Sequence, residues 1–251
     1  MPRHTKIDEV CPGIYRICTN TTRATVGFNQ FLIDDERPAL IHTGQHPLYE
    51  AVRGAIAEVI DPGRLEVIVV PHFEGDECGG MGRFGAEAKS AVLACSAIGA
   101  AINLNQWDYA GPVLGVRDGD TLELGEHTLR FLETPHVHHW DSMMVFEEAT
   151  QSLFPADLFL QPGEQPPVVR DNLATEMCDW YRSAGLFAAE APVVRVVDRL
   201  ERLDPAWVHP MHGGSLPREA LAPYADALRT KSYAFDGSIF GRELATELRA
   251  G

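Results

Sequence analysis

The sequence has no apolar run close to the roughly 20 residues that a membrane-spanning helix needs. Its opening residues, MPRHTKIDEV, lack the apolar segment of a secretory signal peptide. Basic residues are few: the sequence has 21 lysines and arginines but 36 aspartates and glutamates, which gives a formal net charge of −15. Such a surface repels nucleic acids and anionic membranes, so neither is expected as a partner.

Cysteine is also scarce. The five cysteines are Cys11, Cys18, Cys78, Cys95 and Cys178. None forms a C-x-x-C pair, and the odd number fits no simple disulfide framework. Together with the missing signal segment, this predicts a cytoplasmic protein. We expect Cys78 to be a buried, inert thiol rather than a redox-active one.

No repeat, low-complexity tract or linker divides the 251 residues, so we expect one domain over residues 1–251. Strands are predicted within 14–43 and 113–131 and at 65–71, 91–96, 142–148, 152–159 and 206–209. Helices are predicted at 47–60, 96–106, 171–203 (mostly helical) and 215–230. This order favours an α/β sandwich of two mixed sheets packed face to face, with helices on both outer faces.

Four segments place histidine or acidic residues directly after an apolar strand. They are HFEGDE from His72, TPHVHH from Thr134, FPAD from Phe154 and HPMHGG from His209. In the first, residues 72, 74 and 76 alternate, so in an extended chain their side chains would share one face. One histidine after a strand is more often an ordinary hydrogen-bonded group. Four such segments, with carboxylates that repel unless protonated or bound to a cation, predict a metal site.

These segments resemble the metallo-β-lactamase superfamily, with HxExDE in place of its usual HxHxDH. Glutamate at the third position resembles the flavodiiron proteins and their oxygen-binding di-iron relatives, as do FNQFLID, TPHVHHWDSMMVF, LFPADLF and HPMHGGS. The resemblance runs from about Ile14 to about Gly214. It implies the αββα fold, a homodimer and two metal positions. The implied ligands are His72, Glu74 and His138 for the first metal, Asp76 and His212 for the second, and Asp157 as the bridge.

Two positions depart from that branch, which usually has histidine where this chain has Glu77 and aspartate where it has His42. We expect Glu77 to be a further ligand of the second metal, the alternative being that it points away. His42 is expected either to support the metal loop or to be a buried structural residue. His136 and His139 are expected beside the site, unless His139 is merely exposed.

The ligand set favours two iron ions over zinc or manganese, because carboxylate oxygens suit harder ions and an anionic glutamate stabilises a more oxidised metal. Glu74, Asp76, Glu77 and Asp157 would together balance two divalent ions. The leading hypothesis is therefore a di-iron protein that binds or reduces dioxygen or nitric oxide. Asp76 and Glu77 are the candidate catalytic carboxylates.

Flavodiiron proteins add a flavodoxin-like domain, of which this sequence shows no sign, nor of a phosphate-cradling glycine loop. We therefore expect no FMN in this chain and a separate electron donor. The competing hypothesis is hydrolysis of a thioester, lactone, ester or aryl ether, with water activated between the metals and Asp76 handling the proton. A third is a non-enzymatic oxygen sensor. A small-molecule pocket lined by Phe73, Met81, Trp140, Met177, Trp180 and Tyr181 is considered, although core packing is favoured for most of them.

Overall fold

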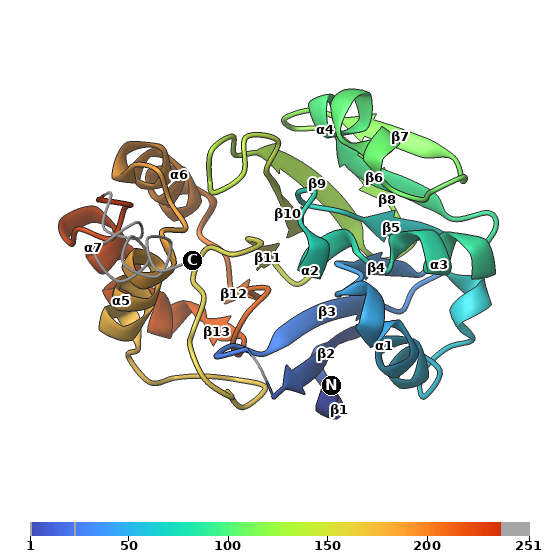
Figure 1. Cartoon of the computed structure of the whole chain (residues 1–251), viewed down its shortest axis with the longest axis horizontal. Helices are drawn as coiled ribbons and strands as arrows, with labels where there is room; N and C mark the ends of the chain where they lie inside the picture. The colour runs from blue at the N-terminus through green and yellow to red at the C-terminus, as the bar shows by residue number, and fades with distance from the viewer. Residues whose placement is uncertain (1, 23, 237–251) are drawn as a thin grey trace, which may run out of the picture.

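The computed structural model describes residues 2–22 and 24–236, which form two β-sheets (Figure 1). Within this part of the chain the first sheet has the order β1-β2-β3-β4-β5-β6-β7 and the second the order β13-β12-β11-β10-β9-β8. The strands are β1 (Pro2–Cys11), β2 (Ile14–Thr21), β3 (Phe28–Ile33), β4 (Ala39–Ile41), β5 (Val67–Val69), β6 (Val92–Ser96), β7 (Val113–Val116), β8 (Thr121–Glu123), β9 (Thr128–Glu133), β10 (Met143–Glu147), β11 (Ser152–Phe154), β12 (Trp207–Val208) and β13 (Leu216–Pro217).

Both sheets are mixed, as predicted. The first is antiparallel from β1 to β4 and parallel from β4 to β7. The second is antiparallel except where β11 lies parallel to β12. The chain passes from one sheet to the other between β7 and β8, within a stretch that the sequence predicted simply as two or three strands.

Two apolar cores follow from the alternation of side chains along the strands. Phe31 of β3 and Val145 of β10 belong to a core that both sheets share, so the sheets pack face to face. Leu32 and Met144, the sequence neighbours of those two residues, belong to the larger core that includes the buried faces of the helices. The predicted sandwich is therefore confirmed.

Helices flank this sandwich. They are α1 (Tyr49–Ile56), α2 (Gly75–Cys78), α3 (Met81–Glu87), α4 (Ala97–Ile102), α5 (Ala174–Ala184), α6 (Glu190–Leu203) and α7 (Arg218–Thr230), with the short 3-10 helices η1 (His46–Leu48), η2 (Pro62–Arg64) and η3 (Leu104–Gln106). In Figure 1, α1, α3 and α4 lie beside the first sheet, while α5, α6 and α7 gather beside the second. The outer layers thus match the expected arrangement.

Three local features differ from the sequence prediction. Residues 2–11 form strand β1, which the polar sequence had not suggested. It is an edge strand, because it pairs with β2 on one side only. The glycine-rich stretch after His72 contains α2 and α3 rather than a loop. The predicted helical region 171–203 is two helices, because Gly185 ends α5 in the left-handed conformation with φ of 64°.

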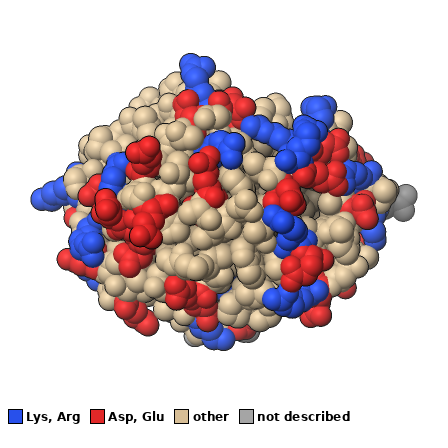
Figure 2. Space-filling view, turned by 180° about the vertical axis from the view of Figure 1, so that it is seen from behind, with Lys and Arg blue, Asp and Glu red and all other residues tan. Residues whose placement is uncertain are grey.

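The surface and the helix lengths bear on the expected partners. Figure 2 shows lysine and arginine side chains intermingled with aspartate and glutamate on the face opposite to that of Figure 1, rather than one continuous basic area. Among the helices that the structure describes, none combines the length and the apolar character needed to cross a membrane.

Candidate metal centre

Four strand ends meet at one edge of the sandwich and carry the candidate ligands. Strands β9 and β11 both run antiparallel to β10, and β12 runs parallel to β11, so their carboxyl ends lie on the same side. Strand β5 ends there as well, because the amide of Met143 at the start of β10 donates to the carbonyl of Pro71, at 2.9 Å. Side chains far apart in the sequence therefore converge on this edge.

The first group of side chains is His72, Glu74, His138 and Asp157, whose ligand atoms all lie within 4.8 Å of one another. His138 Nε2 is 3.0 Å from Glu74 Oε2 and 2.9 Å from Asp157 Oδ2. His72 Nε2 is 3.2 Å from the same glutamate oxygen and 3.4 Å from the same aspartate oxygen. Two imidazoles and two carboxylates thus point at one place, and these are the residues that the sequence assigned to the first metal and to the bridge.

The second group meets the first at Asp157. Its other oxygen, Oδ1, lies 3.1 Å from His212 Nε2, and Asp76 Oδ2 lies 3.5 Å from that same nitrogen. The two oxygens of one carboxylate therefore face two different sets of histidines. This placement is compatible with the expected role of Asp157 as a bridge between two cations.

Neighbouring groups hold these ligands in place. His212 Nδ1 donates to the carbonyl of Gly27 at 2.8 Å, which leaves its Nε2 free to face the carboxylates. The hydroxyl of Tyr181 donates to the carbonyl of Asp157 at 2.7 Å and accepts from the amide of Leu160 at 3.0 Å. Sequence reasoning missed both supports, because a main-chain carbonyl carries no sequence signal and Tyr181 reads as ordinary core.

The electrostatics of the group are those of a site built around positive charge. Burial lowers the pKa of His138, but hydrogen bonds with Asp157 and Glu74 outweigh burial and raise that pKa to about 10. Hydrogen bonds with His138 and His72 lower the pKa of Glu74 to about 2. Burial raises the pKa of Asp157, yet hydrogen bonds with His138 and His212 hold it well below its usual range.

The remaining two imidazoles behave in the same way. Burial lowers the pKa of His72, but the charge of Glu77 and the hydrogen bond with Glu74 raise it to about 9. Burial likewise opposes protonation of His212, and hydrogen bonds with Asp157 and Asp76 raise its pKa well above 6.5. Buried carboxylates here depend on positive partners, which either protonated histidines or metal ions supply. The donor set therefore fits a pair of cations.

Glu77 does not join this group, contrary to our expectation that it would be a ligand of the second metal. Its carboxylate is fully buried on the far side of His72, where Oε2 lies 3.1 Å from His72 Nδ1 and accepts from the His72 amide at 3.2 Å. The cause is α2, since each helical residue turns the side chain by about 100°. The expected alternation also holds only as far as Glu74, which is extended, whereas Asp76 lies within α2.

The other histidines fall into distinct environments. His42 is fully buried, and neither ring nitrogen has a hydrogen-bond partner. His136 is exposed on the β9–β10 loop. His139 is half-buried beside the site, with its Nδ1 paired with Asp141 and its ring stacked on that of His72 at 5.6 Å between centroids.

The candidate pocket residues separate into core and surface. Phe73, Met81, Met177 and Tyr181 are buried in the core, as we favoured, and Trp140 is 36% exposed. All five cysteines are free and buried, and burial raises the pKa of the Cys78 thiol, which agrees with an inert residue.

An open groove of about 640 Å³ leads to the ligands. Glu74, Asp76 and His212 form part of its lining, and the aromatic side chains of Phe28, Trp107, Trp180 also face it. The indole of Trp180 is fixed by donation to Thr25 Oγ1 at 3.1 Å. The groove therefore places apolar aromatic surface beside the carboxylates of Glu74 and Asp76.

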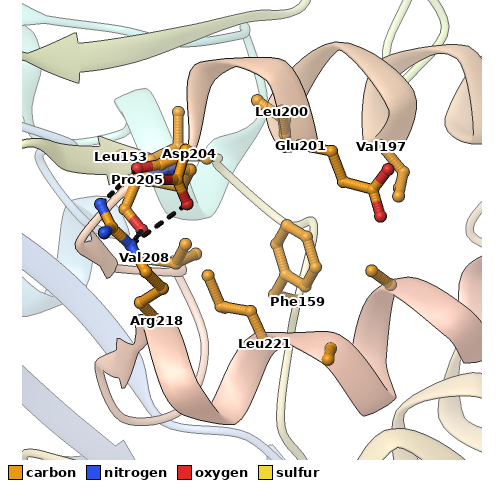
Figure 3. A pocket seen from close by; sticks show the side chains of 12 residues that line it. Leu153, Phe159, Val197, Leu200, Glu201, Asp204, Pro205, Val208, Arg218 and Leu221 are labelled. Atoms are coloured by element: carbon orange, nitrogen blue, oxygen red, sulfur yellow. Dashed lines mark hydrogen bonds and ion pairs between the residues drawn. The ribbon is translucent and has the colours of Figure 1, made fainter.

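A second cleft lies away from this chemistry, between α6 and α7 (Figure 3). It has a volume of about 190 Å³ and is lined mainly by apolar side chains such as Leu200, Phe159 and Leu221. Its main polar feature is the ion pair between Arg218 Nε and Asp204 Oδ1, at 3.2 Å. No histidine or cysteine lines it, so it offers no alternative metal site.

Comparisons with known proteins show what the chain is similar to. The family described as "ODP family beta lactamase" matches residues 26–213. The chain is 30% identical over 197 residues to a rubredoxin-oxygen oxidoreductase of Megalodesulfovibrio gigas, which covers 74% of this chain and 48% of that protein. It is 28% identical over 216 residues to flavo-diiron protein FprA2 of Clostridium acetobutylicum, covering 83% of this chain and 54% of the relative. The chain thus spans about half the length of these two relatives.

A solved structure shows the same fold. The rubredoxin oxygen:oxidoreductase of Desulfovibrio gigas superposes with a TM-score of 0.81 at 21% identity, covering 90% of this chain and 62% of the other. The two sheets and their flanking helices therefore have the same fold as the matched part of that protein.

Proposed function

Because this chain belongs to the ODP family of β-lactamase-type proteins, we propose that it is a di-iron protein that binds or reduces dioxygen or nitric oxide. The observation that carries the proposal is the placement of Asp157, whose two oxygens lie 2.9 Å from His138 Nε2 and 3.1 Å from His212 Nε2. The names of the similar proteins favour redox chemistry and lend the hydrolytic alternative no support.

In this proposal His72, Glu74 and His138 hold the first iron, Asp76 and His212 hold the second, and Asp157 bridges them. Bound iron would supply a place for a small gas molecule and electrons for its reduction. Carboxylate ligands suit iron because they are hard oxygen donors.

The chain's own groups prepare the site for such a ligand. Phe28, Trp107 and Trp180 line the groove with apolar surface, which favours a neutral diatomic gas over water or ions. Asp76 is the carboxylate that is placed to hold or deliver a proton, because its side chain lines the groove and is 21% exposed. Glu77, the other candidate, is buried behind His72 and away from the groove.

Electrons would come from a separate donor that docks at the groove mouth, where Glu74 is 46% exposed. A cytoplasmic location and a homodimer belong to the same proposal. The five free thiols support a reducing compartment, since disulfides are rare there.

The test is to load the full chain with ferrous iron without oxygen, measure the metal content, and then admit dioxygen or nitric oxide while recording the visible spectrum. We expect about two iron ions per chain and a new absorption band with either gas. The Asp157→Asn variant, prepared in parallel, should bind almost no iron and should show no new absorption band with either gas. A spectrum that does not change, combined with turnover of esters or thioesters by the zinc-loaded protein, would overturn the proposal in favour of hydrolysis.

A further inference from the structure

Glu77 lies between two buried histidines. Its Oε2 is 3.1 Å from His72 Nδ1, and its Oε1 is 3.5 Å from His42 Nδ1. All three side chains are closed off from solvent, with exposed fractions of 0% for each. A buried carboxylate is energetically costly unless hydrogen-bond donors surround it, and the donors next to Glu77 are the His72 amide and the two imidazoles.

The two histidines and the carboxylate also have unmet hydrogen-bonding capacity. His72 Nδ1, both nitrogens of His42 and Glu77 Oε1 are buried without a well-aligned hydrogen bond. Four buried side-chain atoms without a partner thus lie within this one group of residues, which calls for an explanation.

The backbone prevents Glu77 from turning toward the groove. The amide and the hydroxyl of Thr43 both donate to the carbonyl of Glu77, at 2.6 and 3.0 Å. Next to it, a Cβ on Gly79 would lie 2.4 Å from the carbonyl of Gly75, and one on Gly80 would lie 2.6 Å from the carbonyl of Thr43. Helix α2 is thus packed directly on the turn that follows β4, and this contact fixes the side on which Glu77 emerges.

This pairing joins the two positions at which the sequence departs from its family pattern. His42 and Glu77 are 35 residues apart in the chain, yet they face each other behind His72. The side chain of His42, which follows β4, therefore lies against that of Glu77 in α2.

We propose that Glu77, backed by His42, is a positioning residue that fixes the ring of His72 through Nδ1 and so presents Nε2 to the first metal. In this arrangement Asp76, His212 and the shared Asp157 would be the protein groups that hold the second metal, and Glu77 would not take part. Hydrogen bonds from a metal-binding histidine to a carboxylate set the tautomer and raise the basicity of the ligand. The inference rests on the two-metal centre of the proposed function.

Cobalt binding to the full-length protein tests the inference, because the visible absorption of Co²⁺ reports each position without any redox reaction. His212→Ala should remove cobalt binding at the second position, so that only the first is measured. His138→Ala should remove binding at the first position, so that only the second is measured. In the His212→Ala background we expect Glu77→Gln to weaken Co²⁺ binding by about 10- to 100-fold. In the His138→Ala background the same substitution should leave the dissociation constant within about twofold, because Glu77 is not a ligand there.

Glu147→Gln is the matched control. Glu147 is also a fully buried glutamate beside a histidine, with its Oε1 3.1 Å from His127 Nδ1, but it lies outside the metal group. We expect it to leave both cobalt dissociation constants unchanged. Loss of binding at both positions in Glu147→Gln and Glu77→Gln alike would mean that damage to the fold explains the effect, and the inference would be rejected.

The remaining outcomes are equally decisive. If Glu77→Gln weakens only the second position, Glu77 is a ligand and the inference is wrong. If it weakens neither, Glu77 has no positioning role. Failure of the proposed function looks different: a parent protein that binds no cobalt refutes the metal centre itself. A protein that binds two cobalt ions as expected, but is inert to both gases when loaded with iron, refutes the redox proposal and leaves the role of Glu77 standing.

Discussion

His212 Nε2 lies 3.1 Å from Oδ1 of Asp157, which leaves the second oxygen of this aspartate for the opposite side of the site. There, Oδ2 is 2.9 Å from His138 Nε2. One side chain on the turn after β11 therefore links two sets of ligands that arrive from different strands. The predictions about metal content follow from this shared position.

Asp157→Ala should lose both metal ions, because a bridging carboxylate serves each of them. We expect elemental analysis after anaerobic iron loading to fall from about two ions per chain to nearly none. Circular dichroism checks that the variant is folded. A folded variant that keeps its full metal content would show that Asp157 is not the bridge.

Asp76→Asn should behave differently, because Asp76 approaches only the His212 side, with Oδ2 3.5 Å from Nε2. We expect about one iron per chain, held by the first group. The comparison with Asp157→Ala under identical loading is the control. Equal loss of metal in the two variants would contradict separate positions.

Protein prepared without metal should be most stable at mildly acidic pH. The pKa values of His72 and His138 rise from 6.5 to about 9 and about 10 in the folded protein, so their contribution is complete below pH 6.5 and disappears as pH rises through 9 to 10. The pKa of Glu74 falls from 4.5 to about 2, so its contribution is present above pH 4.5 and disappears as pH falls toward 2. Thermal unfolding should therefore give the highest Tm between about pH 4.5 and 6.5.

Bound metal should offset the fall in Tm that the metal-free protein shows at alkaline pH. Histidine must lose its proton before it binds a metal, so metal affinity rises with pH as protons compete less. The gain in Tm on adding metal should grow from pH 6 to pH 9. A metal-free protein whose Tm increases over the same interval would contradict the charge arrangement described for His72 and His138.

Phe31→Ala should destabilise the contact between the sheets. Phe31 is completely buried, with its ring centroid 5.1 Å from that of Phe154 in the other sheet. Removing a buried phenylalanine costs about 3–5 kcal/mol, which urea unfolding measures. Ile98→Ala is the control, because Ile98 is 48% exposed and should change the free energy of unfolding by less than about 0.5 kcal/mol. A cost near that of the control would place Phe31 outside a well-packed core.

Much of the fold was predictable because its signals are local. Apolar runs such as LEVIVVP and the helical spacing from Leu48 to Ile56 predict their elements without knowledge of their neighbours. Strand β1 was not predictable, because it is a polar edge strand that pairs with β2 on one side only. Helix α2 has a single turn, too short for any periodicity to appear in glycine-rich sequence.

By itself, the sequence determined which chemical groups stand at the ends of the strands, because ligand type is a property of each residue and strand ends follow from apolar runs. His72, Glu74, His138 and Asp157 are brought together accordingly. Only the tertiary structure decided the direction of each side chain: that Asp157 divides its oxygens between two groups, and that Glu77 faces His42. The physical reason is that the direction of a side chain such as Glu77 depends on its angular position around the short helix α2 and on packing against a turn 35 residues earlier. The local sequence predicts neither of these.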